Sequence, residues 1–158
     1  TVGRTADEAE FQTLLDGMRN AATPQEEQQY RFALTAASHE ALVRRVCDLC
    51  NTEIRSQDVS LVLLYLMQGP QQALVWEWIE ANWADLQKRL PANLHGRALS
   101  GITTVTDAEL AKRIRSFLES GNMPAVGAKT VQQYLELMDT TVAFASRSRD
   151  KLAARFGA

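Results

Sequence analysis

The 158-residue sequence has little cysteine, and the cysteines present do not form a disulfide or metal-binding pattern. Two cysteines, Cys47 and Cys50, are too few for a disulfide framework and supply only half of the four ligands of a structural zinc site. We expect both to be ordinary core thiols of a helix, as free cysteine often is. Because two closely spaced reduced thiols suit a reducing compartment, we expect a cytoplasmic protein.

The sequence also lacks an excess of charge of one sign and a long apolar run. Its 17 basic and 19 acidic side chains nearly balance, so no single-sign field would recruit nucleic acid or an anionic membrane. The longest apolar run, 59–67, is interrupted by Ser60 and is far shorter than the ~20 residues of a membrane span. We therefore expect no nucleic-acid or membrane partner. A basic cluster near the end of the chain fits the carboxyl end of a helix: Arg147, Arg149, Lys151 and Arg155.

Motifs of enzyme active sites are missing as well. His39 is followed by Glu40, but no second histidine completes the H-E-x-x-H spacing that places two imidazoles on one helical face. His95 has no carboxylate or thiol at ligand spacing, and we expect both histidines to be solvated or capping residues. No G-x-S-x-G elbow or glycine-rich phosphate loop is present. The sequence thus offers no catalytic residue and no metal ligand.

What the sequence does have is helical periodicity almost throughout. Threonine and glutamate at capping-box spacing begin three helices, at Thr5 with Glu8, Thr23 with Glu26 and Thr106 with Glu109. Short joins rich in glycine and proline separate the predicted helices, which span 6–21, 24–37, 39–51, 57–68, 70–89, 93–103, 107–120 and 127–156. The sequence predicts an all-α fold of about eight helices in antiparallel hairpins, stacked as an irregular superhelix of the HEAT or armadillo kind. We expect one domain over residues 1–158.

Apolar spacing predicts which helix faces are buried. The helix at 57–68 is apolar all round, which predicts an interior helix. Three other helices carry inward stripes: Trp76, Ile79, Trp83, Leu86 and Leu90; Leu110, Ile114 and Phe117; and Val131, Leu135, Met138, Val142 and Ala145. Trp78 lies about 200° from Trp76 around its helix, so it packs on a second neighbouring helix or faces a cavity. We expect Trp76, Trp78 and Trp83 to form a structural hub.

One ordered set of segments resembles a known family. It begins with E-I-R-S-Q-D at 53–58, continues through the apolar helix and Gly69-Pro70, and ends with V-W-E-W-I-E-A-N-W-A-D-L-Q-K-R-L at 75–90. This order resembles the C-terminal helical domain of zinc aminopeptidases of the aminopeptidase N, puromycin-sensitive and endoplasmic-reticulum types. The similarity extends over roughly residues 6–145. The chain departs from the family at 103–105, where Thr-Thr-Val stands in place of a frequent aromatic residue.

The resemblance implies that the chain is a fragment of a larger multidomain enzyme that removes residues from peptide amino termini. In that family two histidines and a glutamate hold zinc and a G-x-M-E-N loop captures the amine, but neither motif occurs here. The resemblance therefore implies no zinc or other cofactor in this fragment. It implies a non-catalytic lid and scaffold that limits access to the catalytic domain, with that domain and peptide substrates as partners.

Two arginines are candidate peptide-facing or bend-stabilising residues, Arg55 and Arg97. Arg55 could hold its bend through Glu53, Asp58 or free carbonyls. The alternative to an aminopeptidase domain is an independent helical-repeat module that binds a protein partner along a concave face.

Overall fold

The computed structural model describes residues 8–157, and over this range the chain is all-helical with no strand. The predicted all-α class is confirmed. The elements are α1 (Glu8–Arg19), α2 (Pro24–Leu34), α3 (Glu40–Thr52), α4 (Ser56–Met67), α5 (Gln72–Arg89), α6 (Ala92–Ala98), the 3₁₀ turn η1 (Ser100–Thr104), α7 (Ala108–Phe117), the π-turn η2 (Leu118–Asn122) and α8 (Ala128–Phe156).

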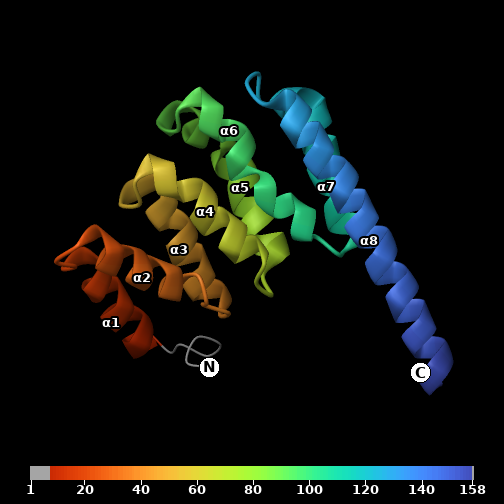
Figure 1. Ribbon diagram of the computed structural model, residues 1–158, viewed down its shortest axis with the longest axis horizontal. Coiled ribbons are helices and arrows are strands. Elements are labelled where there is room, and N and C mark those ends of the chain that lie inside the picture. Colours follow the sequence, from red (N-terminus) through yellow and green to blue (C-terminus); the bar gives the residue numbers. More distant parts are fainter. Residues whose placement is uncertain (1–7, 158) are drawn as a thin grey trace.

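The helices follow one another across the molecule, with α1 and α2 at one end and α7 and α8 at the other (Figure 1). Contacts join neighbours in the chain, such as α1 with α2 and α4 with α5, and also alternate helices, such as α3 with α5 and α4 with α6. Contact between alternate helices is what a stack of helical hairpins requires. The superhelical form of the stack stays a prediction.

Two of the predicted helix starts can be compared with the structure. Thr23 caps α2, because its hydroxyl accepts a hydrogen bond from Glu26 N at 3.1 Å. The prediction for Thr106 is wrong: the cap of α7 is the next residue, Asp107, whose carboxylate accepts from Leu110 N at 2.7 Å. An aspartate at this position also favours the positive end of the helix dipole. The third box, at Thr5, lies outside the described residues.

The segment 93–103 is not one helix, which corrects the predicted boundaries. It divides into α6 and η1, and the Thr104 hydroxyl at the end of η1 donates to the carbonyls of Gly101 at 2.7 Å and Met67 at 3.0 Å. Gly101 lies so close to α4 that an added Cβ would stand 2.6 Å from the Cβ of Met67. Threonine side chains that bond nearby carbonyls compete with helical geometry, and here they turn the chain towards α4.

The helix α4 is not interior on every side, which also corrects the sequence prediction. Val59, Leu63 and Met67 are buried, but Leu61 is 40% exposed and Tyr65 is half-buried. The apolar pattern alone could not reveal this, because a helix that is apolar all round looks the same whether or not a neighbour covers every face.

All three tryptophans lie on α5, and each side chain reaches a different neighbour. The Trp78 indole donates to the Asp48 carboxylate of α3 at 2.8 Å, so it packs on a second helix rather than facing a cavity. Trp83 donates to the carbonyl of Asn122 in η2 at 3.0 Å. Its ring also lies edge-on to His95 of α6, with ring centroids 6.3 Å apart.

Trp76 is fully buried and joins α5 to α7. Its ring meets Phe117 in a T-shaped pair with centroids 5.7 Å apart, a geometry that adds stability beyond the area buried. Its indole N–H donates to Glu80 of the same helix at 2.8 Å. The tryptophan side chains of α5 therefore reach α3, α6, α7 and η2.

Burial along α8 stops about halfway. Val131, Leu135 and Met138 are fully buried, whereas Phe144 is 65% exposed and the remaining turns extend beyond the other helices (Figure 1). The basic cluster at 147–155 lies on this projecting half, as expected for a solvated helix end.

We predict that Trp76→Ala lowers the free energy of unfolding by about 3 to 5 kcal/mol, because it removes a fully buried ring and its aromatic partner contact. Urea denaturation followed by circular dichroism measures this. Phe144→Ala is the matched control and should change stability by less than about 0.5 kcal/mol, since that ring is exposed. Equal losses in the two variants would contradict the assignment.

Candidate functional site

The polar bend 53–58 joins α3 to α4, and residues from α1 hold its first position. Arg19 makes a bidentate pair with Glu53, with Nε to Oε2 at 2.9 Å and Nη2 to Oε1 at 2.6 Å. This pairing lowers the pKa of the Glu53 carboxyl, chiefly through the hydrogen bonds and also through the guanidinium charge. Glu53 therefore fixes the end of α3 to α1.

A second arginine holds the same bend from α5. The Arg89 guanidinium donates to the backbone carbonyls of Asn51 and Ile54. Carbonyls at the end of a helix have no partner within the helix, so a cation is well placed there.

The third contact to the bend comes from α2. Arg31 is 8% exposed and lies between Glu27, at 3.1 Å, and Asp58, at 3.2 Å. Arg55 pairs with the other Glu27 oxygen at 2.8 Å. The sequence offered Glu53 and Asp58 as partners of Arg55, but Glu53 binds Arg19 and Asp58 binds Arg31. Arg55 thus takes part in an ion-pair network, although its side chain remains 56% exposed.

Arg97, the other candidate, lies apart from this network. It is an exposed residue of α6, and within residues 8–157 no hydrogen bond or ion pair joins its side chain to another group. The structure therefore does not bring Arg55 and Arg97 together into one site.

The histidines are not paired either. His95 Nε2 lies 3.0 Å from the carbonyls of both Gln87 and Leu90, so that nitrogen carries the proton and donates to the carboxyl end of α5. His95 is a capping residue, one of the two roles expected. His39 is exposed at the start of α3, where its side chain makes no capping hydrogen bond.

Both cysteines are free and fully buried in α3. Burial raises the pKa of Cys47 to about 12, with a smaller contribution from the Asp48 charge. Burial raises the pKa of Cys50 as well. Because the thiolate is the form that binds metals and attacks electrophiles, these thiols are poor ligands and poor nucleophiles.

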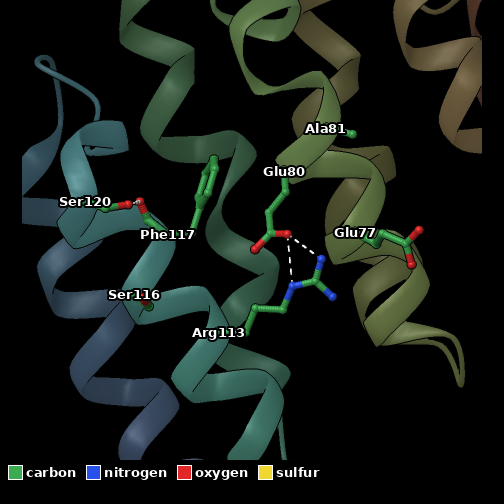
Figure 2. A pocket seen from close by; sticks show the side chains of 7 residues that line it. All are labelled: Glu77, Glu80, Ala81, Arg113, Ser116, Phe117 and Ser120. Carbon is green, nitrogen blue, oxygen red and sulfur yellow. Dashed lines mark hydrogen bonds and ion pairs between the residues drawn. The ribbon is translucent and has the colours of Figure 1, made fainter.

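A hollow of about 510 Å³ between α5 and α7 is lined in part by charged residues, Glu77, Glu80 and Arg113 (Figure 2). Glu80 and Arg113 form an ion pair there, with Arg113 Nε donating to Oε2 at 2.9 Å. The other Glu80 oxygen accepts from Trp76. Figure 2 shows Glu77 pointing away from this pair. Since both Glu80 oxygens already have partners, the hollow presents a structural ion pair and not an acid–base couple.

A different surface, between α2 and α4, was missed in the sequence. It is uncharged apart from the buried Arg31 and includes the exposed ring of Phe32. The signal was present as polar and aromatic residues at helical spacing on α2, at 25, 28, 29 and 32. This spacing did not indicate a functional surface in the sequence, because glutamine side chains have no catalytic chemistry.

The described part of the chain contains no group of three or more His, Cys, Asp or Glu side chains arranged to hold a metal ion. Among these same residues no helix combines the length and the apolar character of a membrane span. The ion pairs of Arg19, Arg31 and Arg113 each join two helices of the fold.

Comparison with protein families gives the more particular result. A family model described as the ERAP1-like C-terminal domain matches residues 1–140. The chain belongs to this family, the C-terminal domain of ERAP1-like aminopeptidases, and the resemblance seen in the sequence is confirmed. Comparison with curated protein sequences gives no significant match.

We predict different effects for the two arginines of the α2 network. Arg31→Met should lower the free energy of unfolding by about 2 kcal/mol or more, because it removes the buried cation that Glu27 and Asp58 share and leaves Asp58 without its ion-pair partner. Arg55→Met should cost less than about 1 kcal/mol, since Arg55 is largely solvated. Urea denaturation of both variants measures the difference, and a larger cost for Arg55→Met would reverse our assignment.

We also predict that neither cysteine reacts with a thiol reagent in the folded protein. Cys47 is hardly ionised at pH 8 with a pKa of about 12, and both thiols are shielded from solvent. Labelling with a chromogenic disulfide should be slow in buffer and should reach both thiols in urea. Fast labelling of either in buffer would show an accessible thiolate.

Proposed function

We propose that this chain is the non-catalytic C-terminal lid and scaffold of a zinc aminopeptidase that removes amino-terminal residues from peptides. In this role it packs on the catalytic domain of the same polypeptide and restricts which peptides reach the active site. The single observation that carries the proposal is the family match over residues 1–140. Within the parent, residues 1–158 would form one helical domain.

The contacts described above support a scaffold role. Side chains from α1, α2 and α5 hold the bend at 53–58. The tryptophans of α5 join that helix to α3, α6 and α7. A domain connected in this way would move as a unit when it closes over another domain. A rigid cover excludes long peptides better than a flexible one.

Zinc chemistry would reside in the catalytic domain of the parent. Among residues 8–157, Cys47, Cys50 and His95 do not fit a zinc site, because both thiols are buried with raised pKa values and Nε2 of His95 is taken up by two carbonyls. What the chain contributes is the shape and surface that peptides meet. We propose a cytoplasmic parent, because two unpaired thiols suit a reducing compartment.

The proposal predicts how the parent enzyme changes when this domain is removed. An enzyme truncated just before Thr1 should still hydrolyse a single aminoacyl anilide, because that small substrate needs only the catalytic domain. Its kcat/KM should depend less on peptide length than that of the whole enzyme. Assays over a series of peptides of increasing length measure this. An unchanged length profile in an active truncated enzyme would contradict a lid.

The isolated chain supplies the complementary test. It should fold, bind no stoichiometric zinc and leave aminoacyl anilides intact. Hydrolysis by the pure chain with about one metal per molecule would overturn the proposal. The reading frame upstream of Thr1 separates it from the alternative: H-E-x-x-H with a distant third glutamate supports an aminopeptidase, and a nearby start codon supports an independent helical-repeat module.

A further inference from the structure

The apolar stripe that anchors α8 continues past the helices that cover it. Its positions alternate in steps of four and three residues, the spacing of a helix that packs lengthwise against another helix. We call this stripe the α8 seam, and its members are Val131, Leu135, Met138, Val142, Ala145, Arg149, Leu152 and Phe156. The first three are fully buried, whereas Leu152 is 56% exposed and Phe156 is 73% exposed. Residues 8–157 thus leave the second half of the seam uncovered, on the part of α8 that projects from the fold (Figure 1).

One position of the seam carries a charge. Arg149 stands between Ala145 and Leu152, where the spacing calls for an apolar residue. Within residues 8–157 no ion pair or hydrogen bond joins its guanidinium to another group, because Asp139, the carboxylate of the same groove, pairs with Arg115 at 2.6 Å. A polar residue at one position of such a seam selects the partner and its register, and a covered cation needs a carboxylate beside it. The partner of the seam therefore carries an acidic residue opposite Arg149.

The placement of the other cations excludes two kinds of partner. Arg147 and Lys151 are each two residues from Arg149, so they lie about 200° around the helix, away from the seam. On a membrane surface Arg149 would enter the bilayer with the apolar seam, while these two cations would point away from the lipid headgroups. Nucleic acid would pair with cations through its phosphates, but it would leave the apolar seam exposed. The seam suits another helix.

A second copy of α8 does not supply the missing carboxylate. In a parallel pair the two Arg149 side chains would stand opposite each other, and in an antiparallel pair the second seam offers no acidic residue. Asp150 is the one carboxylate among residues 142–156, and it lies about 100° from Arg149 around the helix. The partner helix is therefore different from α8 and more acidic.

The length of the uncovered seam indicates where that helix comes from. From Arg149 to Phe156 the helix rises only about 10 Å, and this stretch holds three seam residues. Stable complexes between separate proteins use about 20 to 30 residues on each side. A contact as short as this one suffices when the partner is tethered in the same polypeptide, because the effective concentration is then high.

We propose that the exposed half of the α8 seam packs against an acidic amphipathic helix in another domain of the parent polypeptide. Leu152 and Phe156 pack among the apolar side chains of that helix, and one of its carboxylates pairs with Arg149. The inference rests on the proposed function, which makes the chain one domain of a larger enzyme. It adds the surface through which the lid is held against the rest of that enzyme.

Fluorescence anisotropy with the purified chain tests the chemistry of the seam. The probe is a fluorescein-labelled 21-residue helical peptide with leucine at seam spacing and glutamate on both flanks, and the comparison probe has lysine in place of glutamate. Because a short seam binds weakly without a tether, the titration extends to about 1 mM. We expect saturable binding of the acidic probe and at least tenfold weaker binding of the basic probe. Arg149→Glu should reverse this preference.

A matched pair of variants locates the binding surface on α8. Phe156→Glu introduces a charge within the seam and should weaken binding of the acidic probe at least tenfold. Phe144→Glu introduces the same charge at an exposed ring outside the seam, and it should change binding less than twofold. Circular dichroism checks that each variant keeps its helical content.

Trypsin digestion of the whole parent tests the source of the partner helix. Trypsin cleaves after arginine and lysine, so in the isolated chain it should cut readily after the exposed Arg147, Arg149 and Lys151. In the parent the partner helix should slow these cleavages at least tenfold. Phe156→Glu in the parent should restore fast cleavage, and Phe144→Glu should not.

Four outcomes would overturn the inference. They are no binding of the acidic probe, equal binding of the two probes, equal effects of Phe156→Glu and Phe144→Glu, and cleavage in the parent as fast as in the isolated chain. If any of these occurs while removal of the whole domain still changes the dependence on peptide length, this inference alone is rejected. An unchanged length profile in the truncated parent rejects the proposed function instead.

Discussion

The turn between α3 and α4 is the point on which the first half of the structure depends. Arginines from α1, α2 and α5 converge on it, through Glu53, through Asp58 and through the carbonyls at the end of α3. Each guanidinium offers several donors in a planar fork, so one residue can join two groups that a lysine would join less well. The exposed pair between Arg19 and Glu53 adds little energy by itself, but it fixes the angle between helices whose apolar faces must meet.

The second half depends on α5, which is the link between the two parts. Arg89 at its carboxyl end holds the bend, while Trp76 and Trp83 reach α7, η2 and α6. Burial of large rings supplies the energy here, and their polar N–H groups each find an acceptor, so no indole donor is left unsatisfied. Ion pairs thus orient the helices on one side of α5, and aromatic packing does so on the other.

Much of the fold followed from the sequence because it is encoded locally. Periodicity located every long helix, and the resemblance carried by E-I-R-S-Q-D and the tryptophan helix identified the family. What could not be predicted depends on distant partners. Arg55 could reach several carboxylates, and only the placement of α2 beside the bend gives it Glu27. Likewise η1 breaks away from α6 because the Met67 carbonyl of α4 lies within reach of Thr104.

The open side of α4 follows from how such hairpins are built. A helix that is covered on several sides can be apolar all round and still leave one side to solvent. On α4 that side keeps Leu61 and Tyr65, and α2 adds the exposed ring of Phe32 beside them. Exposed apolar groups gathered in this way cost hydration free energy in the isolated chain, and charged residues would have avoided that cost.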